Sequence, residues 1–177
     1  MASINKSILN KNNFKLIVDK LPTVEYFVQS VNIPGLSFTE VEFGAGVGLD
    51  AFFPGDKVSF DNLEVTFLVD EDVENFKEVY DWITAIVPIH DPKDFKDFTG
   101  SKSTKGVLAS IDNDLNQYSM ITLVTNTNKN IPNKFFRFYD CFPTALSGME
   151  LKSGESGEAV TCTVTFRFTY YDIESTS

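Results

Sequence analysis

The sequence predicts a mainly β protein, a two-sheet β-barrel or sandwich with one flanking α-helix and a long glycine-rich hairpin. Three observations support this fold class. The chain has 17 Phe and 6 Tyr, many of them in alternating runs that favour strands. Turn signals separate these runs into short segments, and one stretch, at about residues 71–87, has helical spacing. The 177 residues are expected to form a single domain, residues 1–177.

The charge and hydropathy of the chain limit the function classes. The formal net charge is -10, which opposes a domain that grips nucleic-acid phosphates. An acidic surface could still face DNA in a channel where sticking would be harmful. No apolar stretch approaches the roughly 20 residues that cross a bilayer, and the N-terminus lacks the apolar core of a signal peptide. We therefore expect an intracellular product without a membrane partner.

The first part of the chain reads as strands. Residues 1–12 are polar and are expected to be flexible. The runs 14–18 and 24–33, joined by a short turn, suggest a hairpin. Residues 36–43 alternate as the next strand. A glycine-rich and phenylalanine-rich connection then extends to the turn signal at residues 54–56.

A further strand is predicted over Lys57–Val69. Leu63, Val65 and Phe67 point to one face, whereas Val58 and Phe60 have the opposite parity. We therefore expect a bulge near Asp61-Asn62.

The predicted helix follows this strand. Asp70, Glu71 and Asp72 suit the exposed amides and the positive end of a helix dipole, so they are interpreted as caps. Pro88 ends the helix. The apolar residues at helical spacing, expected to pack on a sheet, are Val73, Phe76, Val79, Tyr80, Ile83, Ile86 and Val87.

The second half of the chain returns to strands after a polar region. Residues 88–117 are interpreted as a variable surface loop, with a short strand possible at 107–111. Strands are predicted over Tyr118–Thr127, Lys134–Phe142, Ala145–Lys152 and Glu158–Tyr171. The last run alternates almost without interruption, as expected for a strand with one buried and one solvated face.

A search for chemistry finds no catalytic, cofactor or metal site. The sole histidine, His90, has no second His or Cys nearby, as a zinc site would require. No helix or Lys-Ser/Thr follows Gly44–Gly48, so these glycines do not form a phosphate loop. Cys141 and Cys162 lie in strand-like runs and are interpreted as buried free thiols. A non-enzyme is predicted.

Two features lack an explanation within one molecule. The hairpin connection carries apolar side chains that would be exposed, and such loops usually mark interaction surfaces. The long strands also leave edges that an oligomer can pair across subunits. The hairpin residues concerned are Phe43, Gly44, Gly46, Val47, Gly48, Leu49, Phe52 and Phe53.

The order of elements resembles the tail tube protein of contractile-tailed bacteriophages, which is related to secretion-system tube proteins. The resemblance covers most of residues 13–174 and fits least well over 88–117. The matching segments are, in order, SVNIPG at 30–35, the PGD turn at 54–56, FDNLEVTF at 60–67, Phe76 with YDWI at 80–83, YDCFPT at 139–144 and YYDIE at 170–174.

The resemblance implies hexameric rings that stack helically into a tube within a contractile sheath, with DNA passing through the lumen without specific binding. It implies that the hairpin reaches the adjacent ring. It also implies sheath, baseplate and tail-terminator partners, and a place in the virion tail after assembly in the host cytoplasm. Candidate lumen-facing residues, each of which could instead lie on the outer surface, are Glu40, Glu42, Glu64, Thr66, Thr161, Thr163 and Thr165.

Three alternatives remain from the sequence. The chain could be a baseplate-proximal tube initiator or a subunit of a secretion-type injection tube. It could be a monomeric β-sandwich that binds carbohydrate or protein through an aromatic groove. An enzyme of unrecognised type would need a site that the sequence does not offer.

Overall fold

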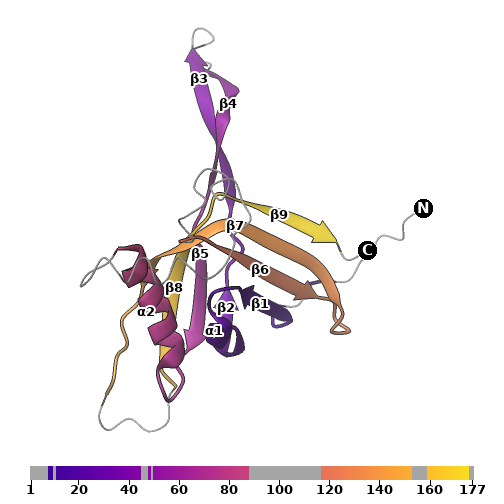
Figure 1. Cartoon of the computed structure of the whole chain (residues 1–177). Helices are drawn as coiled ribbons and strands as arrows, with labels where there is room; N and C mark the ends of the chain where they lie inside the picture. Colours follow the sequence, from indigo (N-terminus) through magenta and orange to yellow (C-terminus); the bar gives the residue numbers. More distant parts are fainter. Residues whose placement is uncertain are drawn as a thin grey trace.

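The structure, a computed structural model, describes residues 8–9, 11–44, 48, 50–87, 117–152 and 159–175. These residues are mainly in strands, and the predicted fold class is confirmed (Figure 1). The elements in chain order are β1 (Phe14–Val18), α1 (Pro22–Phe27), β2 (Val28–Val31), β3 (Leu36–Gly44), β4 (Asp50–Phe60), β5 (Leu63–Leu68), α2 (Glu74–Ile86), β6 (Ser119–Asn126), β7 (Pro132–Leu146), β8 (Thr161–Arg167) and β9 (Tyr170–Ser175).

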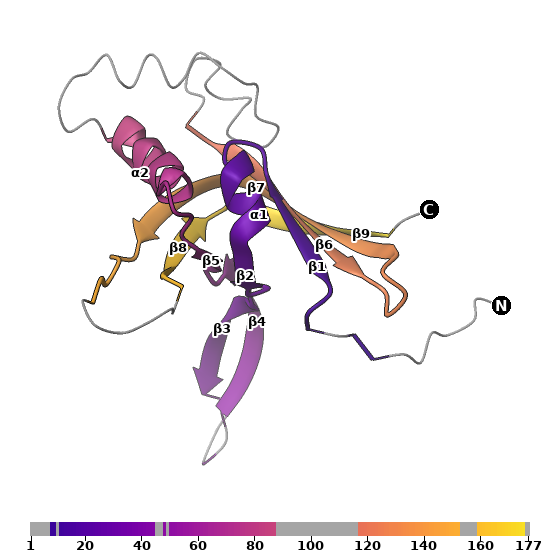
Figure 2. The same ribbon diagram turned by 90° about the horizontal axis from the view of Figure 1, so that it is seen from below.

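One seven-stranded antiparallel sheet forms the body. Its order is β1-β6-β7-β8-β5-β2, and β9 pairs with β7. The long strand β7 joins two halves: residues 132–141 pair with β6 and 134–139 with β9, whereas 142–146 pair with β8. Between them, Asp140 has a φ of 55°, which a carboxylate side chain tolerates better than most. The two halves of the sheet therefore face each other across a common core (Figure 2).

The core is built from the inward faces of both halves. Leu63, Val65 and Phe67 of β5 are buried, as the alternation of the sequence predicts. The same holds for the inward face of β8. The other half of the sheet contributes Leu16 and Phe138.

Helix α2 closes the core through Trp82. Its indole ring lies 5.9 Å from the ring of Phe166, on the inward face of β8. Its Nε1 donates to the carbonyl oxygen of Gln117 at 3.0 Å, so its polar group is satisfied in the core. The predicted packing of this helix on a sheet is confirmed, with Val79 buried and Phe76, Ile83 and Ile86 against the core. The predicted apolar face is wrong at three positions, because the helix turns Trp82 and Ala85 to the core and leaves exposed Val73, Tyr80 and Val87.

The predicted start of the helix is wrong. Helix α2 begins at Glu74 rather than near residue 71, and Val73 precedes it in the left-handed region with a φ of 59°. The N-cap residue Val73 makes no side-chain hydrogen bond, but the Asp70 carboxylate accepts from the Asn75 amide in the first turn at 3.4 Å. The predicted capping therefore holds for Asp70, and within the described residues no such bond is made by Glu71 or Asp72. Asn75 decides the start, because it is buried and its Nδ2 donates to the carbonyl oxygen of Leu68 at 2.7 Å.

The predicted strand over residues 24–33 is wrong in its first half. Residues 22–27 form helix α1, and only residues 28–31 form a strand. The predicted hairpin with residues 14–18 is also wrong, because β1 pairs with β6 and β2 pairs with β5. Pro22 suits the first turn of a helix, and Val24 is buried in the core. The hydroxyl of Thr23 donates to Glu78 of α2 at 2.6 Å. These tertiary contacts override the β propensity of the run.

Several strand boundaries also differ from the prediction. Residues 57–69 form two strands, because the chain leaves β4 at Phe60 and enters the body sheet at Leu63. The predicted strands 134–142 and 145–152 are one strand up to Leu146, and the predicted strand 158–171 divides into β8 and β9. The predicted strand at 107–111, the loop residues 88–116, His90 and most of the N-terminal segment lie outside the described residues.

Replacing Trp82 tests this packing. We expect Trp82→Ala to lower the free energy of unfolding by about 3–5 kcal/mol, because it removes a fully buried aromatic side chain. Urea denaturation followed by circular dichroism measures the change. Tyr80→Ala, on the exposed side of the same helix, is the matched control and should cost far less. Equal costs for the two variants would contradict the assigned packing.

Candidate interaction surfaces

The hairpin of β3 and β4 stands away from the body as a projecting arm (Figure 1). The two strands form a separate two-stranded sheet, and every residue of β3 is exposed. Seven large apolar side chains of this arm are between 56% and 63% exposed: Leu36, Phe38, Val41, Phe43, Phe52, Phe53 and Val58. Seven exposed large apolar side chains on one projecting hairpin indicate an interaction site.

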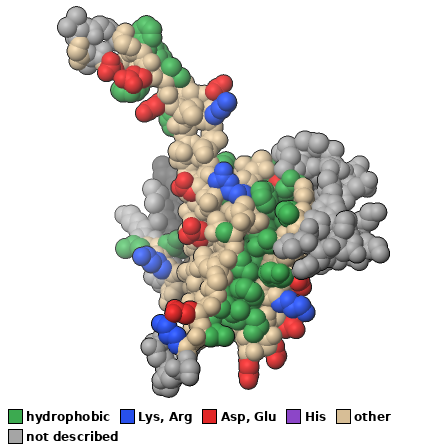
Figure 3. All heavy atoms as spheres, turned by 90° about the vertical axis from the view of Figure 1, so that its left-hand side faces the viewer, with side chains coloured by type: hydrophobic (Ala, Val, Ile, Leu, Met, Phe, Trp, Pro, Cys, Tyr) green, Lys and Arg blue, Asp and Glu red, His purple; other side chains and the backbone are tan. Residues whose placement is uncertain are grey.

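Near its tip the arm has one apolar face. Val41 pairs with Phe53, and Phe43 with Ala51, so these four side chains share a face. The rings of Phe43 and Phe53 meet edge to face at 6.3 Å. Acidic and apolar side chains both lie along the arm in the space-filling view (Figure 3).

The opposite face of the tip is acidic. Glu40 and Glu42 alternate with Val41 and Phe43 along β3, and Glu42 pairs with Phe52. The arm is therefore amphipathic. Of the other hairpin candidates, Gly44 pairs with Asp50 at the end of β3, and Gly48 has a φ of 81°. Gly46, Val47 and Leu49 lie outside the described residues.

The predicted turn at Pro54-Gly55-Asp56 is wrong, because these residues lie within β4. The register shifts there, between the pairs of Phe38 and Glu40. A Cβ atom at Gly55 would overlap the carbonyl oxygen and the hydroxyl of Thr39. Glycine is thus required by the close approach of the two strands.

An aromatic cluster fixes the base of the arm to the body. The ring of Phe60 lies 5.5 Å from that of Phe168 and 5.4 Å from that of Tyr171. The Tyr171 hydroxyl donates to the carbonyl oxygen of Pro34 at 3.4 Å. The Asp61 amide donates to the carbonyl oxygen of Gly35 at 3.1 Å. The direction of the arm is therefore set by packing on β9 and on the residues that connect β8 to it.

A second surface is the outward face of β5 and β8. Glu64 pairs with Thr165, and Thr66 with Thr163, whose hydroxyls lie 3.0 Å apart. Thr161, opposite Leu68, continues this row. Five of the seven lumen candidates therefore share one sheet face. The other two, Glu40 and Glu42, lie on the arm.

This face, here called the hydroxyl face, is nearly free of positive charge. Ser30 of β2 pairs with Thr66 and extends it to a third strand. Arg167 lies at the end nearest the arm, where its Nη1 donates to Asn62 Oδ1 at 2.7 Å. Neutral hydroxyls with one carboxylate, Glu64, offer little attraction to phosphate.

Sequence reasoning missed part of the interaction surface. The sequence predicts strands at Leu36, Phe38 and Val58 but not their exposure, because alternation does not tell which neighbour covers a face. The exposed Leu151, after β7, was also missed, since the run was read as a strand. No local signal separates an exposed apolar residue from a buried one at these positions.

The described residues show no reactive centre. Cys141 and Cys162 are buried free thiols, as predicted, and burial raises the pKa of both. Among residues with described positions, no three His, Cys, Asp or Glu side chains gather as metal ligands. In the same part of the chain, no helix is long and apolar enough to cross a membrane.

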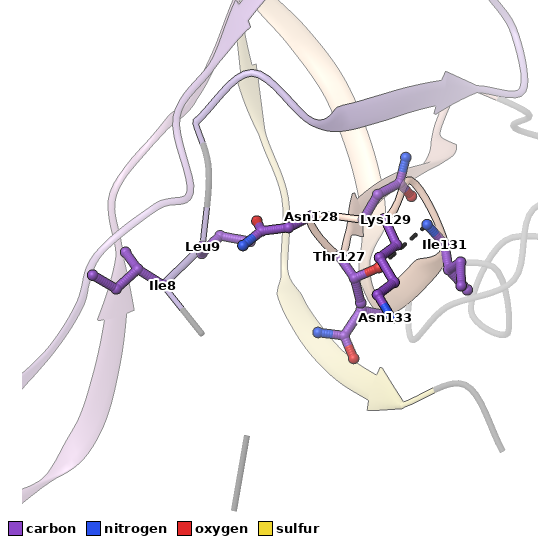
Figure 4. Close-up of a pocket in the computed structure, with 8 residues that line it drawn as sticks. Ile8, Leu9, Thr127, Asn128, Lys129, Ile131 and Asn133 are labelled. Carbon is purple, nitrogen blue, oxygen red and sulfur yellow. Dashed lines mark hydrogen bonds between the residues drawn. The ribbon is translucent and has the colours of Figure 1, made fainter. Parts of the chain in front are cut away.

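Two shallow cavities lie near the N-terminal residues. One is lined by Ile8 and Leu9 together with the turn between β6 and β7, including Thr127 and Ile131 (Figure 4). The Ile131 amide donates to the Thr127 hydroxyl at 3.3 Å, which closes the turn. The other, of about 530 Å³, lies beside β2. Neither contains a cluster of titratable groups.

Comparisons with known proteins place the whole chain beside tail tube proteins. Residues 3–174 match the family model described as phage tail tube protein. The chain is 28% identical over 171 residues to the tail tube terminator protein of Enterobacteria phage T4, covering 93% of this chain and 88% of that protein.

Two solved structures share the fold. One is the tube terminating cap of the anti-feeding prophage, with a TM-score of 0.61 and 12% identity over 99% of this chain and 97% of that chain. The other is in the sheath–tube complex of the PVC extracellular contractile injection system, with a TM-score of 0.56 and 14% identity over 97% and 94% of the two chains.

The glycine in the arm gives a direct test of its geometry. We expect Gly55→Ala to loosen the pairing of β3 and β4, because the added methyl group overlaps the Thr39 backbone. Amide hydrogen exchange in both strands should speed up by about tenfold or more, equivalent to about 1.4 kcal/mol. Gly44→Ala is the control in the same hairpin, since nothing lies within 4 Å of its added Cβ. Unchanged exchange in Gly55→Ala would contradict the close approach.

Proposed function

The chain belongs to the phage tail tube protein family, and on this premise we propose that six copies form a ring and that rings stack into a tail tube. It is a structural protein of the tail tube and terminator type found in contractile phage-like systems, and not an enzyme. One observation carries the proposal: the same subunit has an exposed amphipathic arm and, separately, a sheet face of hydroxyls. The first suits stacking, and the second suits a channel wall.

Ring formation uses the two free edges of the half-sheet that carries the hydroxyl face, here called the inner layer. The layer is ordered β2-β5-β8-β7, and among the described strands β2 has a partner only on its β5 side. The C-terminal part of β7 forms the other edge. Unpaired edges in a soluble protein invite pairing with another chain. Head-to-tail pairing of these two different edges generates a closed ring when the rotation from copy to copy closes after six subunits.

Stacking uses the arm. Its apolar tip face and its exposed base residues have no cover within one subunit. Docking of Val41, Phe43 and Phe53 on the next ring would bury them, at roughly 25 cal/mol per Å² of apolar area. Phe52 lies beside Glu42 on the opposite face of the arm, so it would flank this contact and not enter it.

The channel wall is the hydroxyl face. Helix α2 packs on the opposite side of the β5 and β8 layer, through Trp82 against Phe166. If the hydroxyl face points to the lumen, α2 therefore lies toward the outside of the ring. DNA would pass Thr66, Thr163 and Thr165, and would meet the one described cation of this face, Arg167, only at the end nearest the arm.

The remaining partners follow from this placement. A sheath would surround the side that carries α2, and baseplate and terminator proteins would contact the two ends of the tube. Relatives by fold occur in a sheath–tube complex and in a tube terminating cap. The proposed location is the virion tail, assembled in the host cytoplasm.

A tail tube terminator is the second candidate function. The phage T4 relative has that name, and a tube terminating cap shares the fold. Electron microscopy of the purified protein separates the two functions. Tubes of uniform width with a central channel indicate a tube subunit, whereas single rings that never stack on one another indicate a terminator. A monomer at every concentration and salt condition would overturn both.

Changes to the tip of the arm test stacking. We expect Phe43→Gln with Phe53→Gln to raise the concentration needed for tubes by about a hundredfold, because two apolar rings are lost from the contact. Deleting residues 44–53 should abolish tubes while circular dichroism still reports a folded subunit. Sedimentation and electron microscopy give the readout.

The matched control uses the acidic face of the same arm. Glu40→Gln with Glu42→Gln changes two side chains of similar size and should leave tubes intact. Normal tubes from the double phenylalanine variant, or from the deletion, would show that the arm is not the stacking contact.

A size-dependent labelling experiment tests the channel wall. In assembled tubes, Thr165→Cys should react with a small maleimide but not with a maleimide carried on a globular protein, which cannot enter the lumen. Lys77→Cys, on the exposed side of α2, is the control and should react with both reagents. Reaction of Thr165→Cys with the large reagent in intact tubes would place the hydroxyl face on the outside.

A further inference from the structure

The free edge of β2 lies beside an apolar cavity. This cavity of about 530 Å³ separates β2 from β1 and β6. Its apolar lining is Leu9, Phe14, Val31, Ile33 and Leu123. Ile33 is 44% exposed, although Val31 and Phe14 pack against the core. The cavity is thus an open extension of the core at one side of the subunit.

An exposed apolar side chain that could fill this cavity, Leu151, lies at the other edge of the inner layer. Leu151 follows β7 and is 80% exposed, whereas Met149, two residues earlier, packs against the core. Ser147 still pairs with β8, because its amide donates to the carbonyl oxygen of Thr163 at 2.8 Å. Beyond it, within the described residues, the backbone of 148–152 makes no hydrogen bond. The segment is therefore available to a partner strand.

The two edges are also complementary in charge. Lys11 lines the cavity, and Glu150 precedes Leu151. Glu150 has only an exposed ion pair with Lys152 at 3.5 Å, which contributes little. A contact between copies could exchange this pair for one between Glu150 and Lys11.

We propose that residues 148–152 of one copy lie along the free edge of β2 in the next copy, with Leu151 inserted into the cavity beside β2. The backbone of the segment would add a strand to the inner layer, and Leu151 would fix the register of that strand. The contact is head to tail, so it closes a ring only when every copy gives Leu151 and receives its neighbour's. This inference rests on the proposed ring and names the side chain that locks it.

Disulfide trapping tests the contact. In the Leu151→Cys and Ile33→Cys double variant, mild oxidation should give a ladder of covalent oligomers that ends at the ring size on a non-reducing gel. Each single variant should give nothing above a dimer. The pair Leu151→Cys with Ile131→Cys is the matched control, since Ile131 is similarly exposed but lies on the turn after β6. That pair should give no ladder.

A second variant separates packing from trapping. Leu151→Asp should raise the protein concentration needed for rings by roughly tenfold or more, with the thermal melt of the subunit unchanged. Ile131→Asp should assemble like the wild type. Rings without a ladder, or normal assembly of Leu151→Asp, would overturn this contact and leave the ring standing. A wild-type protein that never forms rings would instead overturn the proposed function.

Discussion

The antiparallel register of β5 and β8 is the constraint on which the rest of the structure depends. Leu63, Val65 and Phe67 meet Phe166, Val164 and Cys162 on one side, and Glu64 and Thr66 meet Thr165 and Thr163 on the other. A slip by one residue would move the hydroxyls into the core and the apolar side chains into water. The pairing therefore defines the core, the hydroxyl face and the side that receives α2 at the same time.

The arm depends on this body but adds nothing to its core. Large apolar side chains along β3 and β4 are exposed to water, and this exposure is unfavourable in an isolated subunit. The cluster of Phe60, Phe168 and Tyr171 holds the base, so the arm has a set direction before any partner arrives. A preset direction lowers the conformational entropy that stacking must overcome. Assembly is thus prepared in the subunit itself.

Charge and hydroxyls have separate roles in this arrangement. The net charge of -10 opposes binding of nucleic-acid phosphates by the subunit as a whole. The hydroxyl face adds a local property, because its central side chains are neutral and Arg167 is held by Asn62 at one end. If this face lines the proposed channel, it would neither attract phosphate strongly nor present a continuous carboxylate lining to a charged polymer. Glu64 supplies the remaining negative charge.

The sequence by itself determined the class of the fold and the two faces of the best strands. Strict alternation in β5 and β8 needed no tertiary information, because the strand period is two residues. The resemblance to tail tube proteins likewise came from the order of short segments. The apolar hairpin was recognised from its Phe residues and glycines, although not its full length.

Only the tertiary structure decided which secondary structure and which exposure particular residues adopted. Residues 24–27 became helical because Val24 reached the core and Thr23 reached Glu78, and α2 started late because Asn75 bonded to Leu68. Gly55 lies in a strand and not in a turn. A glycine is needed at this position because β4 passes so close to Thr39 that no Cβ atom fits between them. Exposure of an apolar residue such as Leu151 depends on which surfaces lie opposite it. Alternation states that a strand has two faces, and only the packed structure states what covers each.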